Sequence, residues 1–191
     1  MDESTLSQIP EKKNQPSFWT ELIKLVFLSL LVVIPFRFYI AQPFVVDGAS
    51  MDPTFETGNY LIVDEISYRF KTPERGSVLI FKYPKDPSKS FIKRVIGLPG
   101  ETVSISGGKV TIINDEHPDG FVLDEPYVKL EKIDNSTNTL DADEYFVMGD
   151  NRASSADSRI WGPVPKENII GQPIIRFYPP ALFPGDYSNK L

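Results

Sequence analysis

In residues 90–100 the sequence reads SFIKRVIGLPG, an apolar and β-branched run that ends in a turn containing proline and glycine. Side chains of a β-strand alternate between its two faces, so Phe91, Lys93 and Val95 would share one face and Ile92, Arg94 and Ile96 the other. Each face therefore carries one cation among apolar neighbours. A lysine in such surroundings loses hydration, which lowers its pKa and lets the neutral amine act as a general base. An edge-strand lysine that prevents aggregation would have the same local sequence, so both interpretations remain open.

Short runs of the same kind, separated by proline and glycine, continue along the chain after residue 40. They cover Pro43–Val46, Tyr60–Val63, Val78–Lys82, Phe91–Ile96, Thr102–Ser106, Lys109–Ile113, Glu144–Met148 and Ile169–Tyr178. Gly107-Gly108 between two alternating runs predicts a hairpin. Residues 114–143 are acidic and turn-rich, as expected for an elaboration between core strands, and no long amphipathic helix follows residue 45. The pattern predicts a mainly β, barrel-like domain.

The N-terminal part of the chain has a different composition. Residues 1–17 are polar and predict a tail, whereas residues 18–40 are apolar with charges only near the ends of the run. A helix of that length would extend about 35 Å, enough to cross the hydrocarbon core of a bilayer. Lysines before the apolar centre favour a cytoplasmic tail. The expectation is a single-pass protein of the cell membrane with residues 41–191 on the extracytoplasmic side; a cleaved signal peptide ending at Ala41 and a buried core helix are the alternatives.

The composition of the 191 residues argues against several classes of function. Hydrophobic residues make up 41% and charged residues 24%, which is typical of a folded protein. A net charge of −6 argues against a nucleic-acid-binding surface. The absence of cysteine excludes disulfides, thiolate metal sites and cysteine nucleophiles. The one histidine, His117, stands in the turn-like segment NDEHPDG, so we expect an exposed loop histidine and a base other than imidazole in any hydrolytic site.

Two further polar clusters stand beside turns, where rigid scaffolds usually place reactive groups. In residues 47–55, DGASMDPTF, Ser50 follows two small residues and precedes a turn whose N–H groups could bind an oxyanion. Taken alone, this segment is better interpreted as a plain strand-to-turn junction. In residues 145–162, YFVMGDNRASSADSRIWG, a strand enters a loop dense in Asp, Asn, Arg and Ser. That composition predicts a self-bonded network of fixed geometry, with a solvated surface loop as the alternative.

Together the three clusters closely resemble the boxes of bacterial type I signal peptidase (leader peptidase), a Ser-Lys dyad serine endopeptidase of the S26 family. Residues 48–54 (GASMDPT) resemble its nucleophile box, and residues 75–81 (RGSVLIF) with 92–101 (IKRVIGLPGE) resemble its lysine box. Residues 149–152 (GDNR), 155–159 (SADSR) and 161–162 (WG) resemble its final box. The order and spacing of the boxes match the family, and the resemblance covers about residues 18–178.

The resemblance implies a role for each matching residue. Ser50 would be the nucleophile and Lys93 the general base. The Ser155 hydroxyl would help to orient the lysine amine. Asp157 would pair with Arg159 and with Arg94, and so keep the final loop against the active site.

The resemblance also implies a fold and a mode of substrate binding. The expected fold is a LexA/signal-peptidase-like coiled β-barrel catalytic domain in residues 41–191, with residues 102–143 as a small inserted β subdomain. Substrate would add as an extended strand beside residues 43–48. The substrate-binding residues implied are Val46, Gly48, Met51, Phe55, Phe91 and Ile92.

The implied activity is removal of N-terminal signal peptides from exported preproteins after Ala-X-Ala sites. We expect a monomer at the lipid bilayer, with no metal, no cofactor and no nucleic acid. One departure concerns the oxyanion hole: some family members have a serine where this chain has Gly48, which leaves the Ser50 N–H as the assignable donor. We expect Gly48→Ser to retain activity.

Two other functions are compatible with parts of the sequence. A LexA-like self-cleaving repressor would need a DNA-binding helical region before the catalytic domain, and an apolar run stands there instead. A non-enzymatic envelope protein that binds peptides would not need an intact set of Ser50, Lys93 and Ser155.

Overall fold

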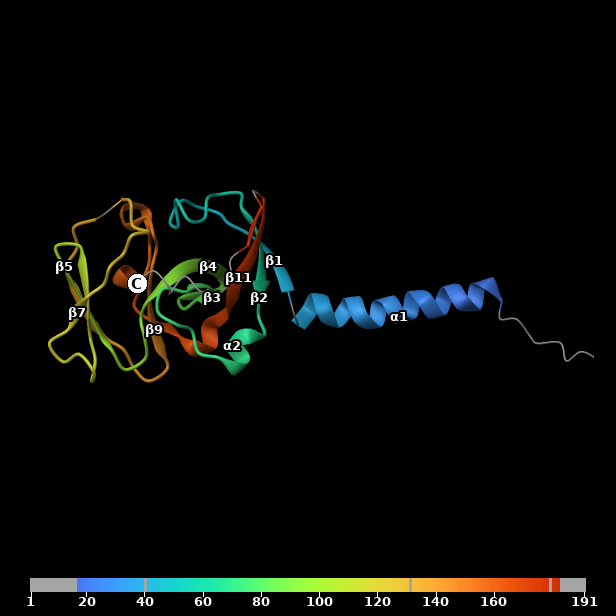
Figure 1. Ribbon diagram of the computed structural model, residues 1–191, viewed down its shortest axis with the longest axis horizontal. Helices are drawn as coiled ribbons and strands as arrows, with labels where there is room; N and C mark the ends of the chain where they lie inside the picture. Colours follow the sequence, from blue (N-terminus) through green and yellow to red (C-terminus); the bar gives the residue numbers. More distant parts are fainter. Residues whose placement is uncertain (1–16, 40, 131, 179, 183–191) are drawn as a thin grey trace, which may run out of the picture. The chain divides into compact units, whose positions relative to one another are not determined.

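The computed structural model describes residues 17–39, 41–130, 132–178 and 180–182 (Figure 1). The chain divides between Phe36 and Arg37 into two compact units. Helix α1 (Phe18–Tyr39) lies where the sequence predicts a helix, and Lys24 Nζ lies 3.0 Å from Glu21 Oε1 within it. Residues 1–16 of the predicted tail lie outside the described residues.

The predicted membrane crossing is not supported by helix α1. In the described part of the chain, no helix is long and apolar enough to cross a membrane. Lys24 and Arg37 bound the uncharged run, which is much shorter than the roughly 20 apolar residues of a typical span. The structure therefore bears out the helix but not the transmembrane segment that the sequence predicts over residues 18–40.

The second unit is built around an antiparallel sheet of eight strands in its described residues (Figure 1). The strand order is β1-β2-β11-β3-β4-β9-β10, with β12 paired to β11. The bounds are β1 Ala41–Val45, β2 Tyr60–Asp64, β3 Val78–Tyr83, β4 Asp86–Gly97, β9 Glu144–Met148, β10 Val164–Pro165, β11 Ile169–Tyr178 and β12 Ala181–Leu182. The pairing follows an open path with β1 and β10 at its ends, and the barrel-like shape stays a prediction.

A smaller antiparallel sheet carries the strands between β4 and β9. Its order over the described residues is β7-β6-β5-β8, with bounds β5 Thr102–Ser106, β6 Lys109–Ile113, β7 Phe121–Val122 and β8 Ser136–Thr139. Gly107 and Gly108 join β5 to β6 with φ of 59° and 86°, the left-handed conformation that a two-residue hairpin turn requires. The hairpin prediction is confirmed, and this sheet lies within residues 102–143, the segment that the family resemblance gives as a small inserted subdomain.

The helices after residue 45 are short, as predicted. They are α2 (Ser67–Phe70), η1 (Arg152–Ser154), α3 (Ser158–Trp161) and η2 (Lys166–Asn168). The mainly β prediction is confirmed, and the predicted strands are all present. Most of their ends differ from the prediction by one or two residues at most, but β4 begins at Asp86, five residues before the predicted start at Phe91. Four short strands of two to four residues each, β7, β8, β10 and β12, were not predicted from the sequence.

Strand β4 lies inside the main sheet, between β3 and β9, so hydrogen bonds flank it on both sides. Its apolar side chains enter three core clusters: Phe91 and Val95 pack with Leu79, Phe81 and Trp161, Ile92 packs with Val46 and Ile80, and Ile96 packs with Val103 and Phe146. Lys93 is only 4% exposed in the middle of this strand. The edge-strand interpretation of Lys93 is therefore wrong.

Candidate active site

Ser50 and Lys93 come from distant parts of the chain and meet at one point. Lys93 Nζ donates a 2.7 Å hydrogen bond to Ser50 Oγ and a 2.9 Å hydrogen bond to the Ile92 carbonyl. Both acceptors are neutral, and no described carboxylate forms an ion pair with the amine. The Phe91 ring covers another side, with its centroid 5.6 Å from Nζ. The arrangement is an almost fully buried amine in contact with a serine hydroxyl.

Burial is the largest influence on the Lys93 amine and lowers its pKa to about 8. Removing water penalises the ammonium form more than the neutral form. The negative charges of Asp157 and Asp150 act in the opposite direction and limit the fall. At mildly alkaline pH much of the amine is therefore neutral, and it lies within hydrogen-bond distance of the hydroxyl that it would deprotonate.

The turn that carries Ser50 is held by the loop after β9. The Asn151 N–H donates to the Ser50 carbonyl at 3.1 Å. A Cβ atom on Gly149 would collide with that same carbonyl and with Ser155 Oγ. Glycine is therefore required here because it alone lets the two loops approach this closely.

Arg94, next to Lys93, is buried on the other face of β4 with an ionic partner. Its Nε and Nη2 donate to the two carboxylate oxygens of Asp150 at 2.8 and 2.6 Å. Asp150 also accepts a 2.6 Å hydrogen bond from Thr54 Oγ1, on the turn that follows Ser50. The family resemblance implied a pair between Arg94 and Asp157, whereas the bidentate partner in the structure is Asp150. The β4–β9 register explains this, because Arg94 lies opposite Met148, just before Asp150 in the chain.

Asp157 and Arg159 form the pair that the sequence analysis expected. Arg159 Nε and Nη2 each lie 2.8 Å from a carboxylate oxygen of Asp157, which also accepts the Gly149 N–H at 3.1 Å. Burial alone would raise the pKa of Asp157, but the hydrogen bonds from Arg159 and from the Gly149 N–H, with the Ser155 hydroxyl close by, outweigh burial and lower it. The carboxylate therefore stays ionised and fixes the loop beside the Lys93 amine.

The predicted contact between the Ser155 hydroxyl and the Lys93 amine is not formed in the structure. Ser155 Oγ is buried, and it has no hydrogen-bond partner of favourable geometry among the described residues. No hydrogen bond thus joins it to the Lys93 amine. Ser155 lies against Gly149 and near Asp157, and its role in orienting the Lys93 amine stays a prediction.

A second set of contacts braces the same loop from the segment 114–143. Arg152 Nη1 and Nη2 lie 3.0 and 2.5 Å from the carboxylate oxygens of Glu125. The Tyr127 ring lies under the Arg94 guanidinium, 4.1 Å from centroid to Cζ. Glu125 and Tyr127 were not predicted as site residues, because neither lies in a family box and no spacing rule connects them to Arg94 and Arg152. Segment 114–143 therefore contacts both Arg94 and Arg152, next to the candidate dyad.

A cavity of about 320 Å³ opens beside Ser50 and Lys93. Three of the predicted substrate-binding residues, Val46, Phe91 and Ile92, line it. Its remaining walls come from the end of β1, from β2 and β3, and from the first half of β4, namely Phe44, Val45, Asp47, Leu61, Ile80, Lys89 and Ser90. The cavity is thus a groove between β1 and β4 with the candidate dyad at one end.

Met51 and Phe55 were predicted to line this groove, and that prediction is wrong. Both side chains are 0% exposed and belong to the core cluster that contains Leu61 and Val63. The turn after Ser50 folds inward, with the Phe55 N–H donating to the Met51 carbonyl at 3.0 Å. These two residues therefore support the groove from below rather than contact a peptide in it.

Gly48 has a backbone conformation that restricts substitution. Its φ is 101°, which side chains rarely adopt, although a Cβ atom would meet open space. Its N–H donates to Thr57 Oγ1 at 3.1 Å. A serine here would strain the turn before Ser50, so the expectation that Gly48→Ser keeps full activity is not supported by the local geometry.

Comparison with known proteins identifies the family of this chain. A family model described as signal peptidase, peptidase S26, matches residues 19–178. The chain belongs to the S26 signal peptidase family. This S26 peptidase is 36% identical over 188 residues to a probable signal peptidase I-2 of Synechocystis sp., covering 94% of the chain and 83% of the relative. It is 40% identical over 167 residues to a signal peptidase I of Leptolyngbya laminosa, covering 83% and 79%.

A solved structure is also similar to the chain. The signal peptidase I of Enterococcus faecalis V583 is 31% identical, with a TM-score of 0.45, and the match covers 53% of this chain and 97% of that one. With the curated relatives, the family match makes the S26 peptidase an enzyme of the signal peptidase I type.

Proposed function

We propose that this S26 peptidase removes signal peptides from exported preproteins with Ser50 as nucleophile and Lys93 as general base. The observation that carries the proposal is the 2.7 Å hydrogen bond between Lys93 Nζ and Ser50 Oγ, made by an amine with a pKa of about 8. A serine hydroxyl is a weak nucleophile and needs an adjacent base. His117 lies in the turn between β6 and β7, where its ring packs on Phe121, so we assign the base to Lys93.

The chemistry follows from these two groups. The neutral Lys93 amine accepts the hydroxyl proton as Ser50 Oγ attacks the carbonyl carbon of the scissile bond. The Ser50 N–H stabilises the oxyanion. The Lys93 ammonium then gives its proton to the departing amine, the C–N bond breaks, and the signal peptide remains attached to Ser50 as an ester. A water molecule that loses a proton to Lys93 hydrolyses this ester and restores the enzyme.

We further propose that cleavage follows Ala-X-Ala sites. The groove beside the dyad is small, and Val46, Phe91 and Ile92 give it apolar walls. Small side chains one and three residues before the cut would fit such walls. An aspartate directly before the cut would lose its hydration without a compensating partner.

The test compares wild type with Ser50→Ala on a preprotein that carries an Ala-X-Ala site. Wild type should release the signal peptide and Ser50→Ala should not, as detected by gel shift and by mass of the mature N-terminus. Replacing the last alanine before the cut with phenylalanine should block processing. Cleavage by Ser50→Ala, or indifference to phenylalanine, would contradict the proposal. Binding without cleavage by wild type would favour the peptide-binding alternative.

A further inference from the structure

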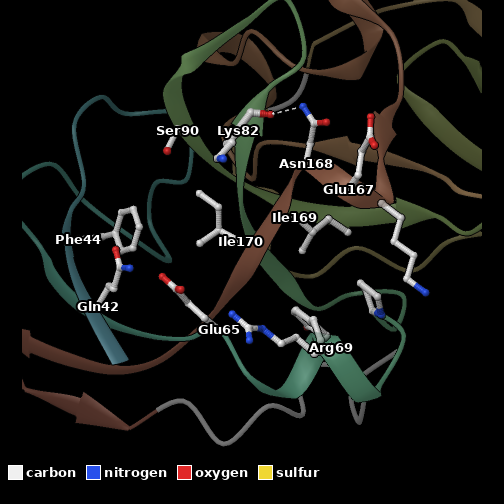
Figure 2. Close-up of a pocket in the computed structure, with 13 residues that line it drawn as sticks. Gln42, Phe44, Glu65, Arg69, Lys82, Ser90, Glu167, Asn168, Ile169 and Ile170 are labelled. Atoms are coloured by element: carbon white, nitrogen blue, oxygen red, sulfur yellow. Dashed lines mark hydrogen bonds between the residues drawn. The ribbon is translucent and has the colours of Figure 1, made fainter. Parts of the chain in front are cut away.

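A second cavity, of about 510 Å³, adjoins the groove that contains Ser50. The two cavities share Phe44 and Ser90 in their linings, so they lie next to each other along β1. Figure 2 shows Gln42, Phe44 and Glu65 on one side of this second cavity and Ile170 facing them. Neither Ser50 nor Lys93 lines it. Its position suggests that it receives a part of the substrate away from the reacting bond.

Strand β1 indicates which part of a bound peptide reaches the second cavity. The active-site groove contacts the chain from Phe44 to Asp47, whereas the second cavity contacts Gln42 and Phe44. An extended peptide advances about 3.3 Å per residue, in step with the strand beside it. With the residue before the cut next to Val46, the residue next to Gln42 is four positions further away, at about the fifth position before the cut.

Glu65 gives the second cavity an unused hydrogen-bond acceptor. Its Oε1 is shielded from solvent and has no hydrogen-bond partner among the described residues. Figure 2 shows the carboxylate directed toward Gln42 and Phe44, with the Arg69 guanidinium nearby. Desolvation raises the pKa of Glu65, while the charge of Arg69 acts in the opposite direction. A shielded acceptor without a partner costs free energy, which a donor on a ligand would recover.

The charges around the cavity favour a neutral donor over a charged one. Two acidic residues, Glu65 and Glu167, and three basic residues, Arg69, Lys82 and Lys166, line it. A cationic side chain beside Glu65 would also approach the surrounding cations. An anionic side chain would face the carboxylate directly. A neutral donor completes the hydrogen bonding without placing another charge in a partly dehydrated space.

We propose that the second cavity is a specificity site for a neutral, hydrogen-bond-donating side chain of the substrate, at about the fifth residue before the cut. The carboxylate of Glu65 accepts the hydrogen bond, and the stem of the side chain lies between Phe44 and Ile170. Serine, threonine, asparagine and glutamine have this chemistry. The proposal rests on the proposed function, because it requires a peptide whose cleavage site lies at Ser50, and it adds a preference that the Ala-X-Ala rule does not contain.

The test uses full-length protein and four peptides with one Ala-X-Ala site, identical except for Gln, Leu, Lys or Glu at the fifth position before the cut. We expect kcat/KM for the Gln peptide to exceed that for the Leu peptide by about 3- to 10-fold, the range of one net hydrogen bond. The Lys and Glu peptides should also fall below Gln. Glu65→Leu should bring the Gln-to-Leu ratio close to one. Glu116→Leu, at an exposed glutamate in the turn between β6 and β7, should keep the wild-type ratio.

Three outcomes would overturn the specificity site: equal rates for Gln and Leu peptides in wild type, a ratio that survives Glu65→Leu, or a preference for the Lys peptide. Should Glu65→Leu fail to fold, Glu65→Gln keeps the size and must still lower the ratio, because a neutral acceptor bonds more weakly than a carboxylate. Loss of all Ser50-dependent cleavage in wild type would overturn the proposed function instead, so the two failures are distinguishable.

Discussion

Lys93 and Arg94 are neighbours on β4 and show two ways of burying a cation. They are 4% and 2% exposed, so depth does not distinguish them. The Lys93 amine contacts neutral oxygens, and burial lowers its pKa to about 8. The Arg94 guanidinium shares both oxygens of Asp150. A buried cation without a direct carboxylate partner becomes a candidate base, whereas one with such a partner joins two segments of the fold.

The largest expected effect is on the rate of cleavage and comes from replacing Lys93, the buried cation without a carboxylate partner among the described residues. Lys93→Ala and Lys93→Arg should each lower kcat by about 10³-fold or more, as should Ser50→Ala. The arginine variant fails because a guanidinium does not deprotonate in proteins. Preprotein processing measures the loss, and circular dichroism checks that the sheets persist. Processing by Lys93→Arg at a tenth of the wild-type rate would contradict the assignment of the base.

Replacing Arg94, the buried cation paired with Asp150, should instead lower the stability of the fold. Arg94→Met leaves the Asp150 carboxylate buried without its bidentate partner and should lower the free energy of unfolding by about 3–5 kcal/mol, measured by urea titration. Lys85→Met, at an exposed lysine in the turn between β3 and β4, should change it by less than about 0.5 kcal/mol. The double variant Arg94→Met with Asp150→Leu should recover much of the loss. A loss below 1 kcal/mol for Arg94→Met would show that this pair does not hold the loop.

The lowered pKa of Lys93 predicts a smaller, pH-dependent effect. Because the unfolded chain binds this proton with a pKa near 10.5 and the folded chain with a pKa of about 8, the folded state is penalised at low pH. The penalty is about 3 kcal/mol below pH 8, declines between pH 8 and pH 10.5, and is nearly gone above that. Lys93→Met removes it, so its stability relative to wild type should be about 3 kcal/mol more favourable at pH 7 than at pH 10.5.

Unfolding titrations at the two pH values measure this difference directly. Lys85→Met is the matched control, because it removes an exposed lysine that lies outside the site. A pH-independent difference for Lys93→Met would mean that the folded chain does not depress the pKa of Lys93.

The smallest expected effect is that of the histidine. In wild type, kcat/KM should rise with pH through a midpoint near 8 as Lys93 loses its proton. His117→Ala should leave that profile unchanged, because His117 is exposed and its ring packs on Phe121 in the smaller sheet. An acidic limb that disappears in His117→Ala would overturn the lysine mechanism.

The alternation of apolar and polar residues, together with the turn residues, predicted most of the main sheet. Each of its long strands has enough residues for the two-residue repeat to be visible. The two-residue strands β7, β10 and β12 carry no period and were missed. The membrane crossing predicted for residues 18–40 is not supported, although the helix is present, because an apolar composition indicates a helix but not whether lipid surrounds it.

The candidate site was also predicted only in part from the sequence. The resemblance to the family boxes predicted Ser50 and Lys93 as site residues, and their side chains are hydrogen-bonded in the structure. Alternation assigns Arg94 to a face, but only the register of β4 against β9 selects Asp150 as its partner. Met51 and Phe55 stand in a turn, where no period separates a residue that lines a groove from one that supports it.

The close approach at Gly149 has an evolutionary consequence. Its α-hydrogen fills the space between the Ser50 carbonyl and the Ser155 side chain, so any larger residue displaces both loops at once. A replacement could be accepted only together with shifts in the two neighbouring segments. We therefore expect residue 149, the backbone at residue 50 and the side chain at residue 155 to change together in related chains rather than singly.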